Sequence, residues 1–252
     1  MKQYQAVIST LERLGGISTL ARLNQEVFKI KDCEWNTKTP FANIRRIVQE
    51  RPEIFRVRPG LWALESFRYK LEAEGIIPQE RVDGGAEDTV FSHGYYQGLL
   101  IEIGRLRDME TYVPAQDRHR KCLGRDLCDM VSLSRVPQFT YQKLVHKIGS
   151  VDVLWFQYNS LDTELLMPKA LFEVEHTTDI QNSLLKFQEL RWFFVNMFIV
   201  ADNKRRNEFA EKMKYSAFSE LRNNKRVEFV SYDQLVSQYN LVSAQPSVSL
   251  LL

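Results

Sequence analysis

The sequence predicts an α/β protein in which a small helical domain precedes a larger domain built around a sheet. In the first 65 residues apolar positions recur mainly at helical spacing, whereas beyond residue 90 strand-like apolar runs alternate with helical segments. Charge is also uneven: residues 1–70 hold 13 Lys and Arg against 7 Asp and Glu, and residues 71–252 hold 21 against 25. A chain of 252 residues is long enough for two such domains.

The first domain, residues 1–66, has the pattern of a winged helix-turn-helix. Helical spacing from Tyr4 to Leu14 ends at Gly15-Gly16, and a second helix runs from about Ser18 to Phe28. A third helix begins at Thr39-Pro40, because threonine is a good N-cap and proline a good first helical residue. A short hairpin turning at Pro59-Gly60 closes the domain and supplies the wing.

Polar and basic side chains occupy the outer face of this third helix and the hairpin. Such side chains can hold phosphates or read base edges, so the basic domain predicts a site for duplex DNA. The predicted DNA contacts are Lys38, Asn43, Arg45, Arg46, Gln49, Arg56 and Arg58. A winged helix used for protein contact is the alternative.

This stretch resembles the HARE-type helix-turn-helix domains that are joined to restriction endonucleases and chromatin proteins. The resemblance covers about residues 1–65. It rests on the helix start at Thr39-Pro40 and on the ending Pro59-Gly60-Leu61-Trp62-Ala63-Leu64.

A turn-rich, acidic connector at 67–90 leads to the second domain, predicted over residues 91–240. The tail, residues 241–252, is apolar but short. Helices and strands alternate in an α/β order. The expected elements are a helix at 92–107, a strand at 109–115, a short helix starting near 139, strands at 151–156 and 171–177, a helix at 180–192, a strand at 193–200, a helix at 206–221 and a strand at 227–230.

Three carboxylates are predicted to converge at one end of a hairpin. Glu173 and Glu175 alternate with apolar residues, so both face one side of a strand. A hairpin tip between residues 163 and 164 places Asp152 opposite Glu175. Neighbouring acids need a cation or a proton between them, and oxygen ligands suit Mg²⁺ or Mn²⁺. The alternative is an acidic strand end with solvated charges, against which the apolar flanks argue.

The order of elements, with Asp152 on one strand and Glu173-Val174-Glu175 on the next, resembles the PD-(D/E)XK nuclease superfamily over about residues 90–240. The string Phe172-Glu173-Val174-Glu175-His176-Thr177-Thr178 before a Leu-rich helix is similar to a bacterial restriction-endonuclease-like group. The resemblance implies a restriction-endonuclease-like α/β nuclease core with a mixed sheet. It also implies Mg²⁺, with Mn²⁺ as a substitute, on Asp152 and Glu173, and cleavage of duplex DNA by a type II restriction or related defence enzyme.

One position departs from the superfamily pattern. Glu175 stands where lysine is usual, although some type II restriction enzymes of the superfamily carry Glu-Xaa-Glu. Glu175 is therefore expected to orient the water, accept its proton or hold a second ion. Three accessory residues remain open: Lys186 as a migrated lysine or a surface residue, Glu102 from the first helix of the domain, and His176 as a structural hydrogen-bonding residue or a ligand.

The sequence bears on location and leaves two other functions open. It has no run of 18 apolar residues and no signal-peptide pattern at its start. Cys33, Cys122 and Cys128 form no CxxC pair, which favours reduced thiols in the cytoplasm over zinc ligands or disulfides. The alternatives to an enzyme are a catalytically inactive nuclease-fold DNA-binding regulator and an interaction subunit of a defence system. A homodimer remains open.

Overall fold

The computed structural model describes residues 1–58, 60–77, 93–138, 140–162 and 164–244, and the chain forms two compact units within it. The first unit comprises Met1–Phe91 together with Val236–Leu252, and the second comprises Ser92–Leu235. The predicted turn-rich stretch at 82–88 and most of the predicted tail lie outside the described residues. None of the described helices has both the length and the apolar character that a membrane span requires.

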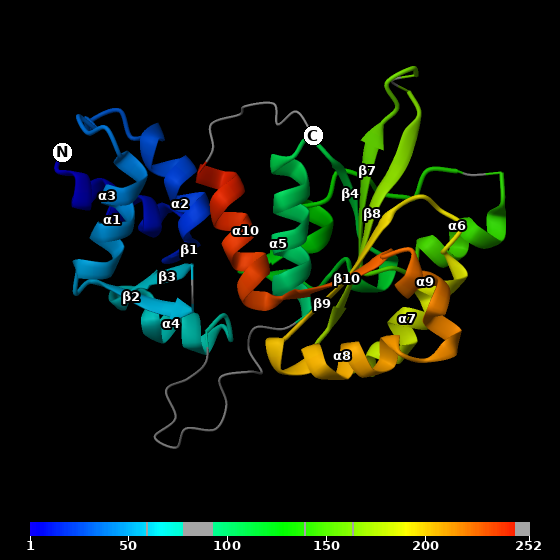
Figure 1. The fold of residues 1–252 in the computed structure, drawn as a ribbon. Coiled ribbons are helices and arrows are strands. Elements are labelled where there is room, and N and C mark those ends of the chain that lie inside the picture. The colour runs from blue at the N-terminus through cyan, green and yellow to red at the C-terminus, as the bar shows by residue number, and fades with distance from the viewer. Residues whose placement is uncertain (59, 78–92, 139, 163, 245–252) are drawn as a thin grey trace. The chain divides into compact units, whose positions relative to one another are not determined.

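The first unit packs its helices against a small antiparallel sheet of order β1-β3-β2 (Figure 1). Three helices and a hairpin lie where the sequence predicts them, and β1 is an unpredicted third strand. Its core contains Leu11, Leu23 and Ile44. Its main elements are α1 (Gln3–Arg13), β1 (Ile17–Thr19), α2 (Leu20–Glu26), α3 (Pro40–Glu50), β2 (Ile54–Arg58), β3 (Leu61–Leu64) and α4 (Arg68–Ala73).

The ends of these helices follow from particular residues. Gly15 and Gly16 both adopt positive φ, of 88° and 86°, which is favourable only for glycine and ends α1 as predicted. Thr19 caps α2 by accepting a hydrogen bond from the Arg22 amide at 3.2 Å. The predicted cap at Thr39 is wrong in detail: Pro40 does begin α3, but the Thr39 side chain makes no capping bond.

The second unit is built on a five-stranded mixed sheet of order β10-β9-β8-β7-β4. Strands β4, β7 and β8 pair antiparallel, whereas β8, β9 and β10 pair parallel. A mixed α/β architecture is therefore confirmed. The elements are α5 (His93–Leu106), β4 (Glu110–Tyr112), β5 (Lys121–Cys122), β6 (Arg125–Asp126), α6 (Gln142–Ile148), β7 (Val153–Tyr158), β8 (Leu166–Glu175), α7 (Ile180–Glu189), β9 (Asn196–Ala201), α8 (Arg206–Met213), α9 (Ser219–Asn223), β10 (Val227–Ser231) and α10 (Tyr232–Ala244).

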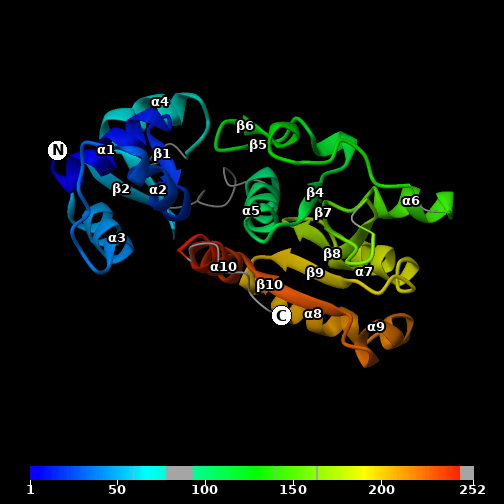
Figure 2. The ribbon, with the colours of Figure 1, turned by 90° about the horizontal axis from the view of Figure 1, so that it is seen from above.

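Helices cover both faces of this sheet (Figures 1 and 2). On one face lies α5, where the Trp155 indole donates to the Leu100 carbonyl at 3.0 Å. On the other face α7 and α9 contribute Leu184, Phe187 and Leu221 to a core shared with alternate strand residues. Leu171, Glu173 and Glu175 are every second residue of β8, so their side chains point to the same side of the sheet. Leu171 belongs to the core on this second face, and the two carboxylates therefore lie on this face as well.

Two predictions about the second unit need correction. The helix predicted at 206–221 is two helices, because residues 214–218 leave the α-helical path. Helix α10 replaces part of the expected tail, and from Val236 onward it belongs to the first unit, where the Tyr239 hydroxyl accepts a hydrogen bond from Thr19 at 3.3 Å.

Candidate active site

The start of β7 and the end of β8 bring the predicted carboxylates to one place. The predicted hairpin is confirmed, but its register is not: Val153 pairs with Phe172, so continuing the register puts Asp152 across from Glu173 rather than Glu175. Two features cause the shift. The loop closes with the Asn159 amide on the Leu165 carbonyl at 2.9 Å, and an irregularity between Trp155 and Phe156 adds one residue on β8.

Glu173 is the most deeply buried member of this group, at 3% exposure. Its Oε1 lies 2.6 Å from the Lys186 ammonium, and its Oε2 accepts from the Ser183 hydroxyl at 3.0 Å. Lys186 also donates to the Ser150 carbonyl at 3.0 Å, which fixes the ammonium beside the carboxylate. Lys186 and Ser183 both lie on α7, so this helix supplies the ammonium and the hydroxyl that contact the Glu173 carboxylate.

Glu175 is almost as buried, at 4% exposure, and it shares the Ser183 hydroxyl with Glu173. Its two carboxylate oxygens accept hydrogen bonds from the hydroxyls of Thr178 and Ser183. No lysine or arginine in the described part of the chain is ion-paired with its carboxylate; the Arg205 guanidinium bonds instead to its backbone carbonyl at 3.2 Å. Glu175 thus has a hydroxyl-lined environment, in contrast to the ammonium beside Glu173.

Asp152 completes the group from the loop before β7. One oxygen, Oδ2, accepts from the Val174 amide at 2.8 Å, which ties the aspartate to the strand that carries both glutamates. The same oxygen lies 3.1 Å from Nε2 of His93, the first residue of α5. Asp152 is 9% exposed, so it is the member of the trio nearest to solvent.

The electrostatics of the trio favour a bound proton or cation. Burial raises the pKa of the Glu173 carboxyl to about 8, and the negative charge of Asp152 adds to this effect while Lys186 opposes it. A buried carboxyl whose pKa is raised in part by a neighbouring carboxylate, with oxygen atoms as the only ligand atoms of the pair, fits a hard divalent cation such as Mg²⁺. A divalent cation bound here would relieve the electrostatic repulsion between the Asp152 and Glu173 carboxylates.

Further polar residues surround Asp152 that the sequence analysis missed. The Gln97 amide donates to Oδ2 of Asp117 at 2.8 Å and to the backbone carbonyl of Asp152 at 3.1 Å. Asp117 is 2% exposed, and its Oδ1 lies 2.6 Å from Arg120. One signal was available: His93 and Gln97 are four residues apart at the start of a predicted helix, so they share a face.

The three predicted accessory residues lie at different places in the fold. Lys186 lies in the site. Glu102 follows His93 by nine residues, which is about half a turn around α5 and about 13 Å along it, so helical geometry directs it away from the His93 side. His176 lies with its Nδ1 3.4 Å from the Tyr232 hydroxyl, a contact of the structural kind that the sequence analysis considered.

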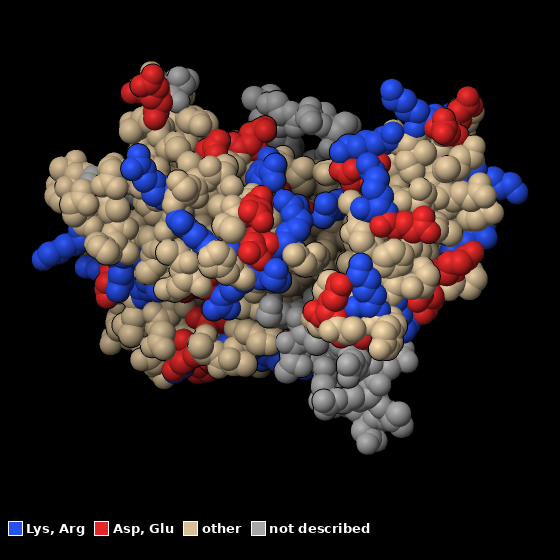
Figure 3. Space-filling model, turned by 180° about the vertical axis from the view of Figure 1, so that it is seen from behind, with Lys and Arg blue, Asp and Glu red and all other residues tan. Residues whose placement is uncertain are grey.

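The predicted DNA contacts of the first unit are mostly exposed. Lys38, Arg45, Arg46, Gln49 and Arg56 are all exposed, and Arg46 lies 3.9 Å from Glu50. Asn43 is partly buried and donates to Gln3 Oε1 at 2.9 Å, and the Arg58 side chain lies outside the described part of the chain. In the view of Figure 3, basic side chains lie interspersed with acidic ones.

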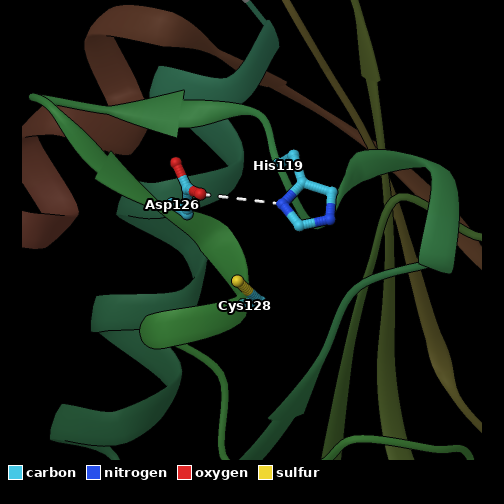
Figure 4. A group of neighbouring side chains, drawn as sticks. All are labelled: His119, Asp126 and Cys128. Atoms are coloured by element: carbon cyan, nitrogen blue, oxygen red, sulfur yellow. Dashed lines mark ion pairs between the residues drawn. The ribbon is translucent and has the colours of Figure 1, made fainter.

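A second polar group lies near the β5–β6 hairpin (Figure 4). His119, Asp126 and Cys128 place their ligand atoms within 4.8 Å of one another, and Nδ1 of His119 lies 3.6 Å from Asp126. His119 is 86% exposed, and Asp126 already pairs with Lys121 at 3.0 Å. All three cysteines are free, as the sequence analysis predicted.

Comparison with models of protein families gives a match. A family model described as the Type II restriction enzyme NmeDI C-terminal domain matches residues 76–248, which is more than half of the chain. Neither the curated proteins nor the solved structures provided a match.

Proposed function

Because this chain belongs to the family of type II restriction enzyme NmeDI C-terminal domains, we propose that it is a Mg²⁺-dependent endonuclease that hydrolyses phosphodiester bonds in duplex DNA. We assign its second unit to the PD-(D/E)XK nucleases and its first unit to the HARE-type winged helix-turn-helix domains. The observation that carries the proposal is the convergence of Asp152, Glu173, Glu175 and Lys186 at the β7–β8 strand ends.

We propose that Lys186 takes the role of the lysine that is missing at the position of Glu175. Glu175 occupies the usual lysine position on the strand, and Lys186 supplies an ammonium from α7 at 2.6 Å from Glu173. An ammonium held there can donate to the attacking water and stabilise negative charge that develops on the phosphate. The migrated lysine is therefore our proposal for the missing family residue.

The other residues have separate roles. Asp152 and Glu173 would hold the cation, with Mn²⁺ as a possible substitute. The bound cation supplies charge neutralisation at the scissile phosphate and a water of lowered pKa. Glu175, fixed by the hydroxyls of Thr178 and Ser183, orients the attacking water and accepts its proton.

DNA binding is assigned to the first unit. Arg45 and Arg46 on α3 and Arg56 on β2 would contact phosphates, and Gln49 would read a base edge. Asn43 is a weaker base contact than the sequence predicts, because its amide already binds Gln3.

The experiment is cleavage of a panel of plasmid and bacteriophage DNAs, with and without base methylation, in Mg²⁺ and then in EDTA. We expect discrete fragments from at least one DNA in Mg²⁺ and intact DNA in EDTA. Tight DNA binding without cleavage on every substrate would instead favour an inactive nuclease-fold regulator, and neither binding nor cleavage would favour an interaction subunit of a defence system.

A further inference from the structure

We propose that His93, Asp117 and Asp152, with Gln97, form a second divalent-cation site that shares Asp152 with the proposed nuclease centre. The inference rests on the proposed function for its biological role, but two of its three ligand residues, His93 and Asp117, are ones that the nuclease mechanism above does not use. The site would take a transition-metal ion such as Mn²⁺ or Co²⁺.

The three ligand residues converge although they lie far apart in sequence. One ligand atom from each of His93, Asp117 and Asp152 falls within 4.8 Å of the others. Both aspartates are buried, at 2% and 9% exposure, and His93 is largely covered. A cation bound here would therefore be enclosed by protein on most sides, unlike one at the exposed group around His119.

Two buried atoms in this cluster lack hydrogen-bond partners among the described residues. Nε2 of His93 is at ion-pair distance from Asp152 but not in hydrogen-bonding geometry, and it has no other partner. The Gln97 side chain is fully buried, and its Oε1 has no partner, although its amide nitrogen binds two members of the cluster. Buried polar atoms are rarely left unsatisfied, so these two atoms point to a ligand.

The packing of α5 explains how the cluster forms. Gly94 faces the hairpin strand β5 so closely that a Cβ atom would lie 2.9 Å from the Lys121 carbonyl oxygen. Gly98, one turn later, faces Cys122 in the same way. These two glycines let the chain after Asp117 approach the helix, and Asp117 is thereby placed beside Gln97, whose neighbour along the helix face is His93.

The donor set indicates the kind of ion. An imidazole nitrogen with carboxylate oxygens suits Mn²⁺, Co²⁺ or Zn²⁺ better than Mg²⁺, which prefers oxygen ligands and retains its waters. Arg120 at 2.6 Å from Asp117 offsets one of the two negative charges, so a dication would leave the site near neutral or positive before it meets a phosphate. A bound dication would thus more than compensate the negative charge that Arg120 leaves on the two aspartates.

The test measures Mn²⁺ binding to the full chain without DNA, by electron paramagnetic resonance. The number of bound ions comes from a titration, and pulsed measurements detect coupling to an imidazole nitrogen. We expect two Mn²⁺ per chain, one of them coupled to nitrogen. His93→Ala should reduce the count to one and remove the nitrogen coupling, whereas Glu173→Gln should reduce the count and leave the coupling.

Two further variants keep the result decisive. His93→Gln retains a polar side chain, so it should lose the nitrogen coupling even if His93→Ala fails to fold. His119→Ala is the matched control, because it removes a histidine from the other candidate group, and it should change nothing. A wild-type protein without a nitrogen-coupled ion, nitrogen coupling that survives in His93→Gln, or coupling lost in His119→Ala would overturn the proposal.

The outcome is separable from that of the proposed function. A chain that binds a nitrogen-coupled Mn²⁺ through His93 but cuts no DNA supports this site and refutes the nuclease. A chain that cuts DNA in Mg²⁺ but shows no nitrogen coupling supports the nuclease and refutes this site.

Discussion

The charged residues that are proposed to act in the two compact units differ in their burial. In the first unit Arg45, Arg46 and Arg56 are exposed, whereas in the second Glu173 and Glu175 are almost completely buried. An exposed charge keeps its hydration and attracts a polyanion over a long range. A buried charge must find a proton, a cation or several hydrogen bonds. Burial therefore distinguishes the proposed DNA-binding surface from the proposed catalytic site.

The largest effect should come from removing one buried charge in the second unit. Glu173→Gln keeps the shape of the side chain but removes a proposed cation ligand, so cleavage should slow by about 10³-fold or more. DNA affinity should hardly change. Single-turnover cleavage and a binding titration measure the two quantities.

The matched control is Glu164→Gln, the same substitution at an exposed position of the β7–β8 hairpin. It should cleave like the wild type. If Glu173→Gln cleaves DNA at a rate within tenfold of the wild-type rate, the Glu173 carboxylate does not contribute to catalysis.

The next effect concerns the exposed charges of the first unit. Changing Arg45, Arg46 and Arg56 together to serine should lower DNA affinity on the order of 10²-fold at 0.1 M salt and flatten the log–log salt slope by about 3. Substitution is preferable to truncation, because the first unit also contains residues from Val236 onward. Changing the same three arginines to lysine keeps the charge and should keep the slope; equal slopes for all three proteins would contradict DNA binding by this surface.

An effect of similar size, on cleavage rather than on DNA affinity, is expected at Lys186. Lys186→Met removes the ammonium beside Glu173 and should slow cleavage about 10²-fold. Lys147→Met is the comparison, since Lys147 forms a similar 2.7 Å ion pair with the more exposed Glu189. If both variants lose activity equally, the ammonium acts on stability rather than on the reaction.

The smallest effect is a pH dependence of stability in the metal-free protein. The Glu173 pKa is raised to about 8, so the folded state holds a proton that the unfolded chain releases near its ordinary value of about 4.3. This contribution is complete below that value and is lost as pH rises to about 8, by at most about 1.4 kcal/mol per pH unit. Thermal midpoints from pH 5 to 9 should fall more steeply for the wild type than for Glu173→Gln, and parallel curves would exclude the raised pKa.

Local patterns made part of this structure predictable. Strand alternation placed Glu173 and Glu175 on one face, and Pro40 marked the start of α3. Helix α10 escaped prediction because its buried residues Leu235 and Tyr239 lie among polar ones, and its last part is stabilised by partners distant in sequence, such as Thr19.

The site itself was predictable only where it is local. Glu173 and Glu175 are neighbours in sequence, but the register that sets Asp152 across from Glu173 depends on an extra residue in β8 that the composition of the strand does not reveal. His93, Gln97 and Asp117 meet Asp152 only through packing of α5 against residues 121–122. Sequence spacing carries no information about contacts of that kind.

The most direct test of the central claim follows DNA binding and cleavage together in Asp152→Asn. This change keeps the size of the side chain and an oxygen that can accept from the Val174 amide, but it removes the negative charge of Asp152. The account predicts that Asp152→Asn binds a cleavable DNA with wild-type affinity and salt slope and does not cut it in Mg²⁺. Wild-type cleavage by Asp152→Asn, or cleavage by the wild type that persists in EDTA, would contradict the account.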